Sequence, residues 1–302
     1  MPERIGFIGV GTMGKPMATN LIKSGHQLSV FDLNPAAVDE LAELGAEPAG
    51  TAAAAVAGAD LAITMVPSSP NVEAAVLGAG GVVEGLKPGT VLIEMSTIDP
   101  LVTRRVAAVA AERGVKMLDA PVSGSLPRAI DGTLTIMVGG PREVFDACLP
   151  ILQRMGKNIF HVGEVGMGET VKLCNNLIAA ISQVAISEAF ALGVAAGVDP
   201  KVLHRVVSKS SGDCWVLRTR PPYPGLVENA PVDQDWAPGF MADLMLKDVG
   251  LALSLAHGLG ATTLLGAVTQ QLYAATSKAG HGKKDMSAVD FVVRALSEGA
   301  HS

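Results

Sequence analysis

The sequence is poor in cysteine and carries no cluster of basic residues. Its 302 residues include 3 cysteines, which are widely spaced and form no CxxC pattern. An odd, scattered set of thiols predicts neither a disulfide framework nor a zinc site, and we expect a reducing, cytoplasmic location. Lys and Arg total 23 against 29 Asp and Glu, for a net charge of -6. Without a basic patch to neutralise phosphates, no nucleic-acid partner is expected.

Metal-binding and hydrolase patterns are also missing. The 6 histidines are scattered and none stands at the spacing of metal ligands, so no metal is expected. No GxSxG nucleophile elbow occurs, which argues against the hydrolases that use one. The apolar stretch at residues 177–198 is interrupted by Ser182, Gln183, Ser187 and Glu188. It predicts a core helix, so no membrane partner is expected.

What the sequence does contain is material for a large core. Apolar residues make up 49% of the chain, and residues 1–163 alternate short β-type runs with amphipathic helical segments. This alternation predicts an α/β Rossmann-type, doubly wound, mostly parallel sheet. Residues 164–302 show helical periodicity, which predicts a second, all-α domain after a glycine-rich junction. Within it, segment 218–240 is a proline-rich loop that its aromatic residues are expected to keep ordered.

A glycine turn follows the first predicted strand. The sequence IGFIGVGTMGKPM places a GxGxxG pattern between that strand and a helix. In such a turn the first glycine allows the tight bend, the second lets a pyrophosphate approach the backbone, and the third lets helix and strand pack closely. N–H groups at the start of the helix then bind the phosphates. The residues assigned to this site are Gly9, Gly11, Thr12, Met13 and Gly14.

An acidic residue ends the second predicted strand, in VFDLNP. Asp32 stands where a carboxylate can accept hydrogen bonds from ribose hydroxyls. It would repel a 2′-phosphate, and no Arg or Lys occurs from Leu33 through Leu44 to bind one. NAD is therefore the expected cofactor, in preference to NADP.

Lys172 and Asn176 are polar residues of an otherwise apolar helical segment, GMGETVKLCNNLIAA. Their i, i+4 spacing places them side by side on one helix face. Burial disfavours the charged form of a lysine and lowers its pKa toward a range useful for proton transfer. The alternative is a lysine whose stem is buried while its charged head reaches water. The neighbouring amide and the preceding dinucleotide-binding domain favour the catalytic interpretation.

Two further segments offer polar groups. DAPVSGS ends a strand and presents the Ser123 hydroxyl and the Gly124 N–H in a turn. Such donors suit a substrate carboxylate, and an ordinary structural turn is the competing interpretation. MLKDVGLAL places Lys247 and Asp248 on a helix, where solvent exposure is the default expectation.

Together these motifs resemble the β-hydroxyacid dehydrogenase family. GFIGVGTMGKPMATNL, STIDP, DAPVSGS, GTLTIMVGG, VKLCNN and LMLKDVGLAL occur in the order and spacing of that family, over nearly the whole chain. SSGDCW, the PPYPGLVENAP loop and GFMADLMLKDVGLA are most similar to members that act on 3-hydroxyisobutyrate. The resemblance implies NAD-dependent oxidation of a small 3-hydroxy acid, most closely 3-hydroxyisobutyrate to methylmalonate semialdehyde, by a homodimer or homotetramer.

The resemblance also implies residue roles. Lys172 would take the hydroxyl proton while a hydride leaves to the nicotinamide, and Asn176 would orient substrate and lysine. Trp215 would enclose the methyl group of the substrate or serve as a core tryptophan. The substrate-binding residues implied are Ser123, Gly124, Trp215, Phe240 and Asp248. The cofactor site would be completed by Val66, Pro67, Asn71, Thr97 and Lys247.

Two positions depart from the family pattern. PVSGS has Ser125 where PVSGG is common, and RPPYPG has Pro221 where relatives usually have the asparagine of an N-P-x-P-G pattern. A serine at position 125 also occurs in relatives that reduce glyoxylate or succinic semialdehyde with NADPH, although Asp32 argues against NADPH, and the loop leaves the substrate size open. One methyl group discriminates only modestly in an apolar pocket, so L-serine and 3-hydroxypropionate are open as well. A non-catalytic NAD-binding module is the alternative from a different class. It would be expected to have lost Lys172, so the pair of Lys172 and Asn176 favours an enzyme.

Overall fold

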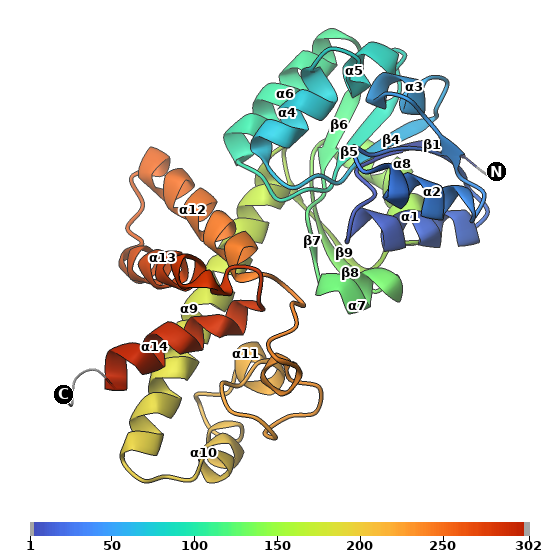
Figure 1. The fold of residues 1–302 in the computed structure, drawn as a ribbon. Coiled ribbons are helices and arrows are strands. Elements are labelled where there is room, and N and C mark those ends of the chain that lie inside the picture. Colours follow the sequence, from blue (N-terminus) through green and yellow to red (C-terminus); the bar gives the residue numbers. More distant parts are fainter. Residues whose placement is uncertain (1–2, 299–302) are drawn as a thin grey trace. The chain divides into compact units, whose positions relative to one another are not determined.

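The computed structural model describes residues 3–298 (Figure 1). The chain divides into two compact units, Met1–Lys172 (unit 1) and Leu173–Ser302 (unit 2). The boundary expected from the sequence, at residue 163, precedes helix α9 (Met167–Ala195), whose first residues belong to unit 1.

Unit 1 is built on a mostly parallel sheet in the order β3-β2-β1-β4-β5-β6-β8-β7, with β9 paired to β8. Neighbouring strands from β3 through β6 run parallel, whereas β8 runs antiparallel to β6 and β7. The predicted α/β Rossmann-type class is confirmed. The strands are β1 (Arg4–Ile8), β2 (Gln27–Phe31), β3 (Glu47–Pro48), β4 (Leu61–Thr64), β5 (Val91–Glu94), β6 (Lys116–Asp119), β7 (Val122–Ser123), β8 (Leu134–Gly139) and β9 (Gly156–Gly163).

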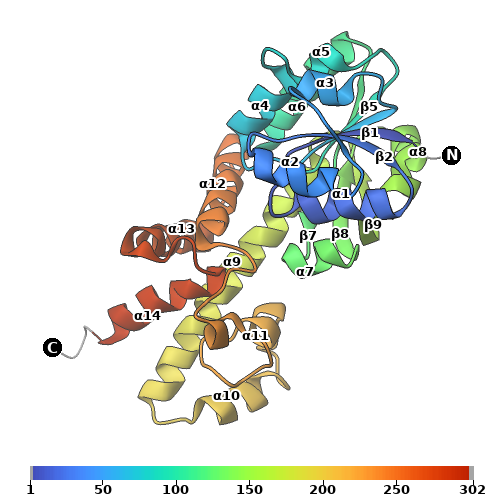
Figure 2. The ribbon, with the colours of Figure 1, turned by 45° about the vertical axis from the view of Figure 1, so that its right-hand side comes forward.

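Helices cover both faces of this sheet (Figure 2). Along β1, Ile5 and Phe7 enter one apolar cluster while Ile8 enters the other, because successive side chains of a strand point to opposite faces. Helices α1, α2 and α8 contribute to the first cluster and α3 to α6 to the second. The helices of unit 1 are α1 (Gly14–Lys23), α2 (Pro35–Ala42), α3 (Ala52–Val56), α4 (Ser69–Leu77), α5 (Val82–Gly85), α6 (Pro100–Glu112), α7 (Ser125–Ile130) and α8 (Arg142–Leu152).

Unit 2 is helical in its described part, apart from an isolated β-bridge between Met241 and Asp285. One core cluster surrounds the fully buried Tyr273 and joins α9, α12 and α13, and a second, smaller one contains Phe190 and Val216. Besides the rest of α9, the unit contains α10 (Pro200–Val207), α11 (Trp215–Thr219), η1 (Pro231–Gln234), α12 (Ala242–Leu259), α13 (Leu264–Thr276), η2 (Ser277–His281), η3 (Met286–Ala288) and α14 (Val289–Glu298).

Aromatic contacts anchor the proline-rich segment 218–240. Tyr223 stacks on Phe190 of α9 with ring centroids 6.0 Å apart, and Trp236 packs against Phe291 of α14 at 4.5 Å. The segment also contains the short helix η1, which the sequence pattern did not predict. These contacts connect the segment to both ends of unit 2.

Helix α9 is long and apolar. Within residues 3–298 it alone has the length and composition of a membrane-crossing helix, a test that core helices of soluble proteins also pass. It carries the polar residues Glu169, Lys172, Asn176, Gln183 and Ser187, all of which are buried.

Candidate functional site

The glycine turn between β1 and α1 has space for a ligand at Gly11 but is tightly packed at Gly9 and Gly14. Gly9 has φ +89°, and a Cβ atom there would overlap the Met65 carbonyl oxygen. A Cβ on Gly14 would overlap the Gly9 carbonyl oxygen, whereas a Cβ on Gly11 would meet no atom within 4 Å. The turn is therefore closed at Gly9 and Gly14 and open at Gly11, the position at which a pyrophosphate approaches the backbone.

Helix α1 begins three residues after this open position. Met13 is its N-cap and Gly14 its first residue, and Thr12 is exposed just before them. The first N–H groups of a helix have no acceptor within the helix and carry the positive end of its dipole. This donor set and the space at Gly11 fit a dinucleotide pyrophosphate.

Asp32 follows β2, and its carboxylate hydrogen-bonds the backbone of the glycine turn. Its Oδ2 accepts the N–H of Val10 at 2.7 Å, and its Oδ1 accepts the N–H of Asn34 at 2.8 Å. Each carboxylate oxygen has a second lone pair. Asp32 can therefore accept ribose hydroxyls while it shapes the turn.

The other predicted cofactor residues of unit 1 lie at the same edge of the sheet. Val66 and Pro67 follow β4, Asn71 lies in α4, and Thr97 follows β5. Strands β1, β4 and β5 are parallel neighbours, so their carboxyl ends meet at one edge. The strand order reverses between β1 and β4, and ligands of open α/β sheets bind at such a switch point.

Ser123 ends β7, and Gly124 follows it as the N-cap of α7. Ser123 pairs with Thr135 of β8, and Gly124 has φ +138°. The next residue, Ser125, has φ +58°, a left-handed conformation that favours glycine. The departure PVSGS thus places a serine in backbone geometry that suits the glycine of the common PVSGG pattern.

Lys172 lies near the start of α9 and is 6% exposed. At this burial both its stem and its charged head are largely removed from solvent. The alternative of a lysine head lying in water therefore does not describe this side chain. Asn176 follows one turn later in the same helix and is also buried.

In unit 2 the structure brings Asn176, Lys247 and Asp248 together. Asn176 Nδ2 donates to Asp248 Oδ2 at 2.5 Å, and Asn175 Nδ2 donates to Asn176 Oδ1 at 3.0 Å. Lys247 Nζ lies 3.2 Å from Asp248 Oδ1, an ion-pair distance. Asp248 is 2% exposed, so the expectation that it lies in solvent is wrong. The contacts on both sides fix the orientation of the Asn176 amide.

The two aromatic residues predicted for substrate binding also lie in unit 2. Trp215 opens α11 and is half-exposed, with the Arg220 guanidinium 4.6 Å from its ring centre. Phe240 precedes α12, packs against the Tyr273 core, and donates its N–H to Asp285 at 3.2 Å.

Buried carboxylates at the edge of the sheet in unit 1 were not predicted. Asp119 ends β6, Glu94 ends β5, and Glu169 lies in the first turn of α9; all three are fully buried. Burial raises the pKa of Asp119, and N–H groups of Gly166 and Glu169 partly oppose the shift. An acidic residue at the carboxyl end of a buried strand is the sequence signal that would have identified Asp119 and Glu94.

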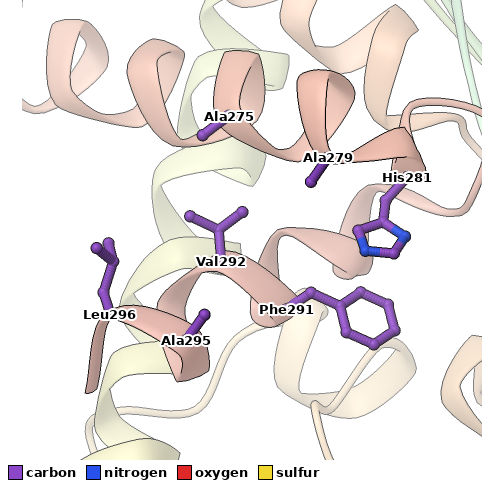
Figure 3. Close-up of a pocket in the computed structure, with 7 residues that line it drawn as sticks. All are labelled: Ala275, Ala279, His281, Phe291, Val292, Ala295 and Leu296. Carbon is purple, nitrogen blue, oxygen red and sulfur yellow. The ribbon is translucent and has the colours of Figure 1, made fainter. Parts of the chain in front are cut away.

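Unit 2 has an apolar recess between α13 with η2 and α14 (Figure 3). His281 stacks on Phe291 at its edge, with ring centroids 4.3 Å apart. None of the predicted site residues lines it. Within residues 3–298 there is no group of His, Cys, Asp and Glu arranged to hold a metal ion.

Two protein families match the chain. Residues 4–163 match the NAD-binding domain of 6-phosphogluconate dehydrogenase, and residues 166–293 match the NAD-binding domain of NADP-dependent 3-hydroxyisobutyrate dehydrogenase. Together the two matches span both units.

Individual relatives are similar over nearly their whole length. An NAD-dependent L-serine dehydrogenase of Pseudomonas aeruginosa is 46% identical, over 95% of this chain and 96% of that protein. A 3-hydroxyisobutyrate dehydrogenase of the same organism is 44% identical, over 96% of this chain and 98% of that protein. The structure of Mycobacterium tuberculosis 3-hydroxyisobutyrate dehydrogenase with L-serine has a TM-score of 0.92 and 38% identity, covering 97% of this chain and 100% of that one.

Proposed function

Because the chain belongs to the β-hydroxyacid dehydrogenase family, as an NAD-dependent oxidoreductase of small 3-hydroxy acids, we propose that it oxidises 3-hydroxyisobutyrate to methylmalonate semialdehyde. The observation that carries the proposal is the buried Lys172, which follows an NAD-type glycine turn in unit 1. The 44% identity to a 3-hydroxyisobutyrate dehydrogenase and the match of residues 166–293 support this substrate.

Lys172 acts as the general base in this proposal. Its Nζ, when neutral, accepts the proton of the substrate hydroxyl as the carbonyl forms, and returns a proton in the reverse direction. Bound NAD supplies the hydride acceptor. The proton transfer needs the neutral amine, and the burial of Lys172 limits the access of solvent to it.

Asn176 orients the substrate hydroxyl toward Lys172. Asn176 Nδ2 donates a hydrogen bond to Asp248, and Asn176 Oδ1 accepts one from Asn175. These two hydrogen bonds keep the Asn176 amide from rotating. The Ser123 hydroxyl and the Gly124 N–H bind the substrate carboxylate. Phe240 and Trp215 contribute apolar surface near the substrate methyl group.

L-Serine is the second candidate substrate. The 46% identity to an L-serine dehydrogenase favours it. One methyl group in an apolar pocket discriminates by only about 1–3 kcal/mol, so we expect measurable turnover of both acids, and of 3-hydroxypropionate. Asp32 makes an NADPH-dependent reductase of glyoxylate or succinic semialdehyde the weaker alternative.

Initial rates of absorbance change at 340 nm test the substrate. The rates of the purified protein are measured with NAD and with NADP, and are compared among (S)-3-hydroxyisobutyrate, L-serine, 3-hydroxypropionate and 4-hydroxybutyrate. The highest kcat/KM for 3-hydroxyisobutyrate with NAD is expected. A higher kcat/KM for L-serine would move the substrate assignment and leave the chemistry in place.

Replacement of the base tests the chemistry separately. Lys172→Ala is expected to lower kcat by about 10²- to 10⁴-fold, the usual contribution of general acid–base catalysis. Its Kd for NAD should stay near that of the parent protein. Full activity of this variant would refute the assigned role of Lys172.

We also infer a homodimer or homotetramer. Large apolar side chains are exposed on the helices of unit 2, among them Leu192, Leu264 and Leu265 at 73%, 76% and 66% exposure, and such surface is commonly buried against another subunit. Sedimentation of the protein as a monomer at micromolar concentration would contradict this inference.

A further inference from the structure

We propose that Asp119 is a positioning residue for Lys172: its buried carboxylate fixes the first turn of α9 to the carboxyl end of β6. The inference rests on the role of Lys172 proposed above. Asp119 itself takes no part in the proton transfer.

The contacts of Asp119 reach the start of α9 at two points. Its Oδ1 accepts the N–H of Gly166 at 2.8 Å, and its Oδ2 accepts the N–H of Glu169 at 3.0 Å. The two oxygens of one carboxylate thus hold the residue before the helix and a residue of its first turn. Lys172 follows Glu169 by three positions, which places both on the same side of the helix.

Two glycines allow the carboxylate and the helix to approach this closely. A Cβ atom on Gly168 would lie 2.8 Å from Asp119 Oδ2 and would overlap the Met137 carbonyl oxygen. A Cβ on Gly139 of β8 would lie 2.5 Å from Asp119 Oδ1 and 2.9 Å from the Gly168 nitrogen. The first turn of α9 therefore fits against β6 and β8 with no space to shift toward the sheet.

Glu169 extends this connection to the next strand. Its Oε2 accepts the N–H of Ile98 at 3.2 Å, directly after Thr97 of the proposed cofactor site. The start of α9 is thus tied to the ends of both β5 and β6. Because these strand ends border the cofactor edge of the sheet, the ties set the position of Lys172 relative to that edge.

The energetics favour a functional reason for Asp119. Removing a carboxylate from water is costly, and burial raises its pKa. Hydrogen bonds from two N–H groups and the positive end of the α9 dipole offset part of that cost. An exposed serine or threonine would cap a helix without the burial cost. What the buried carboxylate adds is a two-point attachment to a rigid strand, which defines where the helix starts.

Asp119→Asn tests the proposal. The amide keeps one acceptor oxygen but turns an NH₂ group toward the second N–H donor, so the first turn is released at one point. We expect kcat to fall by about 10- to 100-fold, since displacements near 1 Å carry penalties of this size. The Kd for NAD should change by less than about twofold. The primary deuterium isotope effect on kcat should rise, because hydride transfer with proton removal becomes the slower step.

Asp199→Asn is the matched control. Asp199 caps α10 with its Oδ1, which accepts the N–H groups of Lys201 at 2.7 Å and Val202 at 3.4 Å. The same chemical change at a helix start without a proposed site residue should leave kcat and the isotope effect unchanged. Equal kcat in Asp119→Asn and the parent protein would refute the proposal. So would a loss of NAD affinity that matches the loss of kcat, because the whole sheet edge would then be disturbed.

Gly168→Ala provides a second route if Asp119→Asn does not fold. The added methyl pushes the first turn away from Asp119 while the carboxylate remains. It should reproduce the lower kcat and the larger isotope effect, whereas Gly258→Ala, at a position in α12 where a Cβ meets no atom within 4 Å, should not. Unchanged kcat in Gly168→Ala would count against the proposal. Full activity of Lys172→Ala would instead refute the role of Lys172 itself, so the two failures are distinguishable.

Discussion

At the scale of single residues, Gly11 and Gly14 of the glycine turn have different roles, although both are glycines. Gly11 faces open space, whereas Gly14 packs against the Gly9 carbonyl. We expect Gly11→Ala to keep the stability of the parent protein but to raise the Kd for NAD by at least about 10-fold, because the methyl group occupies the place of the pyrophosphate. Titration calorimetry with NAD and a thermal melt check both parts.

Gly14→Ala is the companion variant. Its methyl group would overlap the Gly9 carbonyl oxygen, so the protein itself should lose stability before any ligand is added. Equal stability of Gly11→Ala and Gly14→Ala without NAD would contradict this division of roles.

Ser125 offers a test of backbone strain. Its φ of +58° lies in the left-handed region, where a residue with a Cβ is disfavoured by about 1 kcal/mol or more. Ser125→Gly should therefore raise the free energy of unfolding of unit 1 by up to about 1 kcal/mol, with part of the gain offset by the greater freedom of glycine in the unfolded chain. Differential scanning calorimetry measures the shift. A lower melting temperature would show that the serine side chain contributes more than the strain costs.

Residue-scale prediction from the sequence succeeds where the cause is local. The turn at Gly9 to Gly14 could be predicted because the bend, the helix start and the strand are consecutive in the chain. Asp119 could not, because its two donors are 47 and 50 residues away and only the fold brings them to its carboxylate. The left-handed backbone at Ser125 was likewise hidden, because a serine gives no sign of it.

At the scale of elements, one buried ion pair connects α11, the segment before α12 and η3. Arg220 Nε lies 3.1 Å from Asp285 Oδ1, and Asp285 also accepts the N–H groups of Gly239, Phe240 and Ser287. Both side chains of the pair are at most 8% exposed. Through the hydrogen bond from the Phe240 N–H to Asp285, this pair therefore fixes the position of the Phe240 backbone.

Breaking the pair should be costly for unit 2. Asp285→Ala leaves a buried guanidinium without its partner, and we expect a loss of about 3–5 kcal/mol in the free energy of unfolding. Asp213→Ala, which removes the partially exposed Asp213–Arg218 pair, should cost about 0–1 kcal/mol. The chain has 2 tryptophans, Trp215 and Trp236, and both lie in unit 2. Their fluorescence in a urea titration reports this unit selectively, and similar losses for the two variants would contradict the prediction.

Prediction of the elements from the sequence was limited for very short strands and for the direction of strands. The strands of four or more residues follow apolar runs, but β3 and β7 have two residues each and no periodic pattern. The antiparallel direction of β8 was not predictable either, because apolar runs carry no information on direction. The partner of Arg220 lies 65 residues away in sequence, so this ion pair became visible only in the fold.

At the scale of the whole molecule, stability should depend on pH through Asp290. Burial raises its pKa to about 6 from 3.8, against the opposing effect of Arg294. The folded protein binds this proton more tightly than the unfolded chain, so its contribution is fully present below about pH 4 and is lost as pH rises through about 6. The contribution lost is on the order of 3 kcal/mol. We expect tryptophan-detected unfolding to show this decline in unit 2.

Asp290→Asn should remove that pH-dependent contribution, because an amide does not titrate. Asp233→Asn, at an exposed carboxylate of the same unit, should retain the decline of the parent protein. Since two units can unfold separately, the comparison uses the fluorescence signal and not a single global transition. An unchanged pH profile in Asp290→Asn would assign the decline to other groups.

Asp32 bears on any attempt to redesign the coenzyme preference of this protein. Its carboxylate shapes the glycine turn through Val10 and Asn34 before any ribose is present. A library that varies position 32 alone would therefore select for a correctly folded turn as well as for binding of a new coenzyme. Substitutions that suit the new coenzyme would be lost whenever they disrupt the turn. Pairing each substitution with a new acceptor for the Val10 N–H would separate the two selections.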